Sequence, residues 1–306
     1  MMERPIQGRR PQHPLPHNAD DNQRELSYLQ CVDKLGQRCE QEKNVVALWV
    51  HGSRGRGNNQ AGSDLDITIV HDGSKVDEVR AMCRQEIGEP ILLFDFYEDD
   101  LTDGWYHNGF EVGLRVISQE QLKAVASSFY SSLDNVDQHQ DFIRHGILSG
   151  RPIIDKVGIL RSMQSDLGDM PEAIQVGLFD RHLGRGLQKI AWLEARPVVT
   201  SPFERLRHAN LVIDSLSRAT YALNGTLYIR GMKYLSEDLG GMRPSLAFEF
   251  TEMTTLVNSN GDGAIWLAPC NRVITSLAGE FKTRFPDVSL SKRVEEYLSR
   301  LTNNEQ

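Results

Sequence analysis

Two aspartates separated by one residue, Asp64 and Asp66, have the types and spacing of a metal-binding pair. They open the apolar run Leu65 to Val70, which is typical of a strand. Because side chains alternate between the faces of a strand, both carboxylates lie on one face, about 6 to 7 Å apart. Aspartate is depleted in strands, and a charge in an apolar setting needs a compensating partner. The pair is therefore predicted to chelate a divalent cation.

A second motif precedes this pair. The apolar run Val45 to Val50 predicts a strand that ends at His51, and Gly52 and Ser53 follow it. Glycine permits a close approach of the backbone and serine caps helices, so a turn of this composition can hold phosphate. Magnesium prefers carboxylate oxygens together with phosphate oxygens. The turn and the aspartate pair together predict a site for a nucleoside triphosphate and divalent metal.

The Gly-Ser pair, a spacer of ten residues and the Asp-x-Asp motif resemble the signature of the polymerase-β-type nucleotidyltransferase superfamily. The resemblance implies that a hydroxyl attacks the α-phosphorus of a nucleoside triphosphate and that pyrophosphate leaves. It implies that Asp64 and Asp66 hold two Mg²⁺ ions. It also implies that Gly52, Ser53 and Arg54 bind the nucleotide through its phosphates.

The third carboxylate of such a site has two candidates. Asp95 interrupts the apolar run 91–97, directly after a predicted helix, where the superfamily places its third acid. Glu111 occupies a similar setting in the run 110–117. Arg115 lies four residues later on the same strand face, so pairing with Arg115 is the alternative explanation for Glu111. The predicted catalytic and metal-binding residues are Asp64, Asp66 and Asp95, with Glu111 as the alternative third acid.

The pattern of apolar residues along the whole chain indicates which domains contain these residues. Residues 1–22 lack periodicity and are expected to form a disordered leader. Residues 23–133 mix helical and strand patterns and are predicted to be the catalytic domain, with a small mixed sheet. Residues 134–306 show helical stripes and almost no strand signal. The predicted fold is α+β, a small mixed-sheet nucleotidyltransferase domain followed by an α-helical bundle that binds the substrate.

Two further stretches extend the resemblance. The segments 148–155 and 222–228, with Lys233 and Tyr234 beyond, resemble parts of two-domain antibiotic nucleotidyltransferases of the aminoglycoside and lincosamide kind. This resemblance implies transfer of AMP from ATP to a hydroxyl of a small molecule. It also implies that Lys233 binds the nucleotide, whereas a solvent-exposed helix lysine is the alternative explanation.

Charge and composition bear on the partner and the compartment. The formal net charge is −8, and no long stretch of lysine or arginine argues for nucleic acid. Nucleotidylation of a protein or an RNA, and a non-catalytic nucleotide-binding regulator, remain the alternatives to a small-molecule transferase. The sequence contains neither an apolar run long enough to span a membrane nor the apolar core of a secretion signal at residues 1–22. A cytoplasmic protein is expected, and its oligomeric state is not predicted.

The four cysteines support the same expectation. They are dispersed, with no C-x-x-C spacing and no histidine cluster beside them. This spacing argues against a zinc site and against a disulfide framework, and it suits a reducing compartment. The residues are Cys31, Cys39, Cys83 and Cys270.

Overall fold

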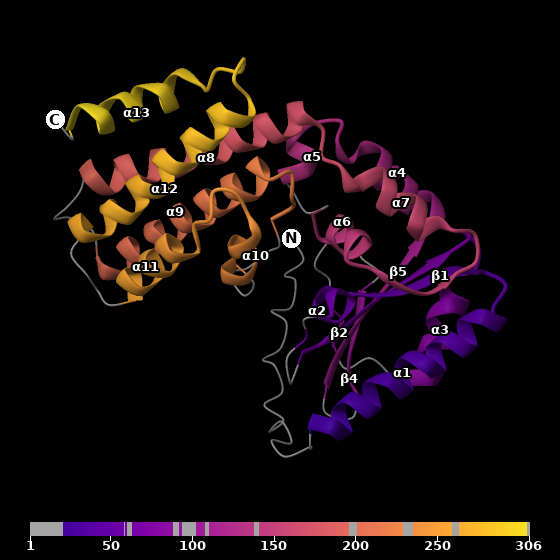
Figure 1. Ribbon diagram of the computed structural model, residues 1–306. Coiled ribbons are helices and arrows are strands. Elements are labelled where there is room, and N and C mark those ends of the chain that lie inside the picture. The colour runs from indigo at the N-terminus through magenta and orange to yellow at the C-terminus, as the bar shows by residue number, and fades with distance from the viewer. Residues whose placement is uncertain are drawn as a thin grey trace, which may run out of the picture. The chain divides into compact units, whose positions relative to one another are not determined.

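The computed structural model describes residues 21–57, 59, 63–87, 92–93, 102–107, 110–137, 141–195, 201–228, 235–258 and 263–304. The chain divides into two compact units (Figure 1). The sheet unit takes its described residues from Met1–Ala124 and Gly146–Met163, and the helical unit takes its own from Val125–His145 and Gln164–Gln306. The sequence pattern predicts that all residues after 133 belong to the second domain. The segment 146–163 groups with the first because it contributes a strand to the sheet.

The sheet unit is built around a mixed sheet. In the described part of the chain, six strands form this sheet in the order β3-β4-β5-β2-β1-β6. Strands β2 and β5 are parallel, whereas the other neighbouring pairs are antiparallel. In chain order the elements are α1 (Asp21–Gln41), β1 (Val45–His51), α2 (Gly52–Arg56), β2 (Leu65–His71), α3 (Val76–Ile87), β3 (Leu92–Leu93), β4 (Thr102–His107), β5 (Phe110–Ser118) and β6 (Arg151–Asp155).

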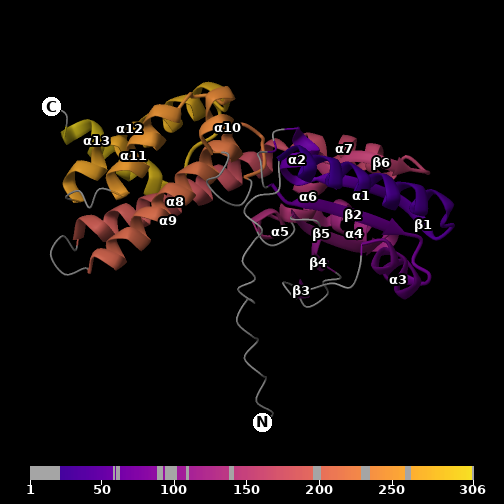
Figure 2. The same ribbon diagram turned by 90° about the horizontal axis from the view of Figure 1, so that it is seen from below.

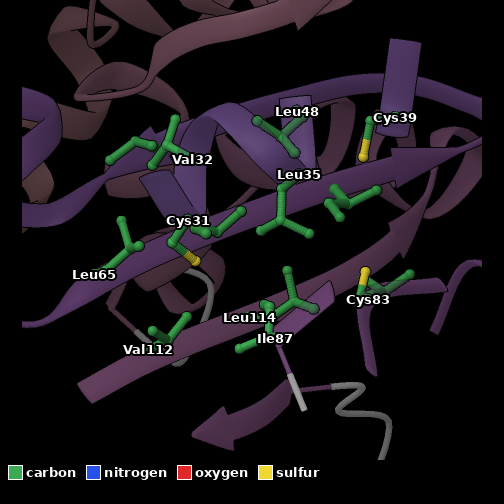
Figure 3. Close-up of a cluster of buried hydrophobic side chains, with 14 of the residues drawn as sticks. Cys31, Val32, Leu35, Cys39, Leu48, Leu65, Cys83, Ile87, Val112 and Leu114 are labelled. Atoms are coloured by element: carbon green, nitrogen blue, oxygen red, sulfur yellow. The ribbon is translucent and has the colours of Figure 1, made fainter. Parts of the chain in front are cut away.

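One face of this sheet carries the hydrophobic core. Helices α1 and α3 both pack on it, and Figure 3 shows their side chains meeting those of β1, β2 and β5. On β2 the alternate residues Leu65, Ile67 and Ile69 belong to this cluster and are at most 1% exposed. Because strand side chains alternate, Asp66 and Thr68 therefore lie on the opposite face.

Small residues allow the chain to pack closely on that opposite face. A Cβ on Gly150 would lie 2.9 Å from Cδ1 of Trp49, and a Cβ on Gly146 would lie 3.5 Å from the ring of His51. Trp49 and His51 are 1% and 4% exposed. The segment 146–150 thus packs against the end of β1, next to the predicted site, and at Gly150 this approach leaves no room for a side chain.

The helical unit contains the predicted bundle. Two of its long helices, α8 and α9, lie side by side (Figures 1 and 2). Phe179 of α8 stacks on Phe281 of α12 with ring centroids 4.7 Å apart, which joins a third long helix to the pair. Helices α4, α6 and α7 cross from one unit into the other along the chain. The helices are α4 (Gln119–Phe129), α5 (Leu133–Asp137), α6 (Asp141–Leu148), α7 (Ile159–Gly168), α8 (Glu172–Ala195), α9 (Pro202–Leu223), α10 (Leu235–Gly241), α11 (Ala247–Asn258), α12 (Gly263–Arg284) and α13 (Lys292–Asn304).

The predicted fold class is confirmed: a small mixed sheet comes first and a mainly helical region follows it. Strands β4 and β6 were not predicted. Strand β6 is an edge strand that pairs only with β1, and its second residue is proline, which weakens a strand pattern. Among the described helices, none combines the length and the apolar character that crossing a bilayer requires.

Arg144 is a buried charge in the helical unit. Its side chain is 1% exposed and lies over the rings of Phe129 and Tyr130, with Cζ 4.5 and 4.6 Å from their centroids. Nη2 donates to the carbonyl oxygen of Leu167 at 2.8 Å, whereas Nε and Nη1 have no hydrogen-bond partner among the described residues. Burial lowers the pKa of Arg144 to about 9, so the group still carries its charge at neutral pH.

Two substitutions at Arg144 are therefore expected to differ. Methionine fills a similar volume without a buried charge, and we expect Arg144→Met to keep the free energy of unfolding within about 1 kcal/mol of the wild type. Arg144→Ala leaves a cavity beside the two rings and should lower the free energy of unfolding by about 2 to 4 kcal/mol. Urea unfolding of both variants measures the difference. Equal destabilisation by the two would show that the guanidinium contacts, and not the filled volume, stabilise this region.

Candidate active site

The turn after β1 begins a short helix whose N-cap is His51, with no side-chain hydrogen bond at the cap, so Ser53 does not cap it. Strand β1 ends at His51, and Gly52 has a φ of +66°, a left-handed conformation that favours glycine. The short helix α2 begins at Gly52 and ends before Gly57, whose φ is +75°. Ser53 is 5% exposed, and its Oγ has no hydrogen-bond partner among the described residues. The turn therefore carries a hydroxyl whose hydrogen-bonding capacity the described protein groups leave unused.

The two aspartates lie at the beginning of β2. Asp64 precedes the strand and is exposed, while Asp66 is its second residue and is half-buried. Asp66 lies on the face opposite the hydrophobic core, because its neighbour Leu65 points into that core. Asp64 lies directly before the strand, so a shared face for the two carboxylates stays a prediction.

The carboxylate of Asp66 lies in a slot between two glycines. A Cβ on Gly52 would lie 2.2 Å from Oδ2 of Asp66, and a Cβ on Gly113 would lie 3.4 Å from Oδ1. These positions follow from the register, because the Cα partners of Asp66 are His51 on β1 and Gly113 on β5. The slot brings one carboxylate of the Asp-x-Asp motif directly against the turn.

A buried polar pair lies next to Asp66 on the same face. Nε2 of His51 lies 3.0 Å from Oγ1 of Thr68, and both side chains are 4% exposed. Sequence analysis did not assign roles to His51, Thr68 or Gly113. The signals were present: a histidine ends an apolar strand, and a glycine interrupts one, which marks a close approach to another group.

Glu111 lies on the strand next to β2. Strand β5 runs parallel to β2 and pairs Gly113 with Asp66, so Glu111 is two residues earlier on the face that carries Asp66. Glu111 is half-buried. The other candidate, Asp95, lies outside the described residues, as does Lys233. The nearest described residues before Asp95 form β3, which pairs with β4 at the edge of the sheet.

Arg54 does not extend from α2 into solvent. It is 6% exposed, and its guanidinium lies against the backbone that precedes β2. Nε donates to the carbonyl oxygen of Asp64 at 3.2 Å, and Nη2 donates to that of Ser63 at 3.3 Å. Its other contacts are with Glu25 and Tyr28 of helix α1.

Comparison with known families identifies this unit. Residues 33–103 match a family model described as "Polymerase beta, Nucleotidyltransferase", and the matched range contains both motifs of the site. Residues 33–103 are thus a polymerase β-type nucleotidyltransferase domain. The enzyme's general activity is therefore nucleotidyl transfer. None of the curated proteins compared with this chain matches it.

The nucleotidyltransferase is also similar to solved structures. One is a nucleotidyltransferase-like protein from Exiguobacterium sibiricum 255-15. The two chains have 10% sequence identity and a TM-score of 0.40, and the similarity covers 92% of this chain and 88% of that chain.

The residues of the nucleotidyltransferase site fit a hard divalent cation. The described residues contain no group of three or more histidine, cysteine, aspartate or glutamate side chains placed to hold a metal. Asp64 and Asp66 offer carboxylate oxygens two residues apart at the beginning of β2, and a Cβ on Gly52 would lie 2.2 Å from Oδ2 of Asp66. Magnesium is commonly held by one or two carboxylates together with substrate phosphates. The residue types of the aspartate pair meet the carboxylate part of that requirement.

Proposed function

We propose that this nucleotidyltransferase moves AMP from ATP to a hydroxyl of a small-molecule acceptor and releases pyrophosphate. The observation that supports the chemistry best is the contact between the Asp66 carboxylate and the Gly52 turn. A cation held by this carboxylate would lie beside phosphates held by the turn. Transfer at the α-phosphorus requires this proximity, because the same cation would then contact both the Asp66 carboxylate and the reacting phosphate.

Asp64 and Asp66 are the proposed ligands of two Mg²⁺ ions. When bound, these ions would neutralise charge on the phosphates and favour loss of the proton from the acceptor hydroxyl. Ser53 would donate its hydroxyl hydrogen to a phosphate oxygen, a role supported by the absence of a partner for Oγ among the described residues. The backbone at Gly52 would approach the phosphates closely, because glycine has no side chain to obstruct them.

Glu111 is our proposed third acid, and Asp95 is the alternative. Sequence analysis ranked Asp95 first, but the parallel register supports Glu111, since it places Glu111 on the Asp66 face of the neighbouring strand. In the proposed step the acceptor oxygen forms a bond to the α-phosphorus. The bond from that phosphorus to the bridging oxygen breaks, and pyrophosphate leaves with its electron pair. The hydroxyl proton passes to the carboxylate of the third acid.

The choice of donor and acceptor rests on the sequence. The segments 148–155 and 222–228 resemble antibiotic nucleotidyltransferases, which implies ATP and a small hydroxylated acceptor. A net charge of −8 favours a small, cationic acceptor over nucleic acid. Lys233 remains a proposed nucleotide contact.

Label transfer tests this proposal. The protein is incubated with Mg²⁺, a cell extract and each of the four nucleoside triphosphates labelled at the α-phosphorus, and the products are separated into small-molecule, protein and RNA fractions. We expect label from ATP in the small-molecule fraction, and none with Asp66→Asn. Label in the protein or RNA fraction would show that the acceptor is a protein or an RNA. Nucleotide binding without transfer to any fraction would instead support a regulator.

A further inference from the structure

We propose that Arg54 is a positioning residue that orients Asp64 for metal binding, by holding the two peptide groups on either side of it. This inference rests on the proposed function of Asp64 as a metal ligand. It gives Arg54 a different role from the nucleotide contact that the family resemblance implied.

The first observation is which carbonyls the guanidinium contacts. Nη2 donates to the carbonyl oxygen of Ser63, which belongs to the peptide before Asp64. Nε donates to the carbonyl oxygen of Asp64, which belongs to the peptide after it. Each peptide group is planar, so holding both planes restricts the two backbone dihedrals of Asp64. The direction of its Cα–Cβ bond, and hence of its carboxylate, is restricted with them.

The second observation is that the sheet does not hold Asp64. Strand β2 begins at Leu65, and the paired residues of β2 begin at Leu65 opposite Val112 and at Asp66 opposite His51. Asp64 therefore lies just outside the hydrogen-bonded ladder that orients Asp66. Its side chain is exposed, so packing does not orient it either. The Arg54 contacts take the place of the ladder at this position.

The third observation is that helix α1 anchors the guanidinium. Nη1 of Arg54 pairs with Oε2 of Glu25 at 2.8 Å, and Cζ lies 4.2 Å from the ring centroid of Tyr28. Tyr28 is 3% exposed, and its hydroxyl accepts a hydrogen bond from Nη2 of Arg151 at 3.0 Å. Helix α1 is itself packed on the sheet through the hydrophobic core. Arg54 thus connects Asp64 to a rigid part of the sheet unit.

The chemistry of arginine explains why this residue type is suited to the position. The guanidinium is a rigid planar fork that donates to several acceptors at fixed angles, and it stacks on aromatic rings. Lysine offers a compact charge on a flexible chain and cannot reproduce the fork. Groups that orient a metal ligand typically change metal affinity or activity by about 10- to 100-fold when they are removed.

The test measures Mn²⁺ binding to the full-length protein by electron paramagnetic resonance, without turnover. Arg54→Met and Arg54→Lys are compared with Arg151→Met, a matched control that removes a contact with Tyr28 but none with residues 63–64. Asp64→Asn identifies the part of the binding that depends on Asp64. Thermal unfolding of each variant checks that it is folded. Amide hydrogen exchange of residues 63–66 in metal-free protein reports on the backbone directly.

We expect Arg54→Met to weaken the Asp64-dependent Mn²⁺ affinity about 10- to 100-fold and to speed exchange at residues 63–66. Arg54→Lys should weaken that affinity nearly as much, and Arg151→Met should leave it unchanged. If folded Arg54→Met binds Mn²⁺ as tightly as the wild type, the inference is overturned while the metal site stands. If the wild type has no Mn²⁺ binding that Asp64→Asn removes, the proposed function fails, and the inference fails with it.

Discussion

Replacing Asp66 with asparagine is expected to lower kcat/KM for nucleotidyl transfer by at least about a thousandfold, equivalent to roughly 4 kcal/mol of transition-state stabilisation. Asparagine has nearly the same shape but lacks the negative charge. Its amide would occupy the slot between Gly52 and Gly113 without providing an anionic ligand for the cation. The loss should therefore appear in the chemical step as well as in the metal concentration that the enzyme requires.

The control for this prediction is Asp77→Asn, because Asp77 is an exposed carboxylate on α3. It should retain wild-type activity. The free energy of unfolding of Asp66→Asn should stay within about 1 kcal/mol of the wild type, since the substitution changes little packing. Initial rates over a range of Mg²⁺ concentrations and urea unfolding provide the two measurements. A folded Asp66→Asn variant that keeps more than a tenth of wild-type activity would contradict the assignment of Asp66 as a metal ligand.

The second large effect is expected at Gly52. A left-handed φ of +66° costs a residue with a side chain about 1 to 2 kcal/mol. The added Cβ would also lie 2.2 Å from Oδ2 of Asp66, far inside van der Waals contact, so the carboxylate must move. Displacement of a catalytic group by about 1 Å can cost about 100-fold in rate. We expect Gly52→Ala to lose at least that much activity.

Gly57 provides a matched control for the backbone strain. Its φ is +75°, and a Cβ there would meet no atom within 4 Å. Gly57→Ala should therefore show a similar loss of unfolding free energy but nearly full activity. The activity of Gly113→Ala should lie between those of Gly52→Ala and Gly57→Ala. Its Cβ would touch Oδ1 of Asp66, but at 3.4 Å, which is an ordinary contact distance. Equal losses of activity in Gly52→Ala and Gly57→Ala would attribute the effect to strain and not to the Asp66 carboxylate.

The sequence determines most about this protein where a property is local. The run before His51 and the run after Asp64 are apolar and β-branched, and they form β1 and β2. The period of a strand places Asp66 on the face opposite Leu65 whatever the rest of the fold does. The left-handed backbone at Gly52 also follows from a local preference, since glycine adopts this conformation at little cost. Helical spacing in the second half predicted α8 and α9 for the same reason.

The tertiary structure decided which of these elements are neighbours. Strand β5 lies parallel to β2, with β4 and β3 beyond it, and this order places Glu111 and Gly113 beside the aspartate pair. Strand β6 is distant from β1 in sequence but pairs with it in the sheet. Hydrophobic periodicity predicts which face of a strand is buried but contains no information about which strand lies next to it. Strand order depends on contacts between residues distant in sequence.

Arg54 illustrates the same division. By sequence alone it follows a phosphate-binding turn, so a contact with the nucleotide was the natural prediction. The structure places its guanidinium on the carbonyl groups of residues 63–64 and on Glu25 and Tyr28 of α1. The sequence by itself determined the residue types of the site and the faces on which they lie. Only the tertiary structure decided which backbone groups and carboxylates they contact, because those contacts depend on how α1, β2 and β5 pack together.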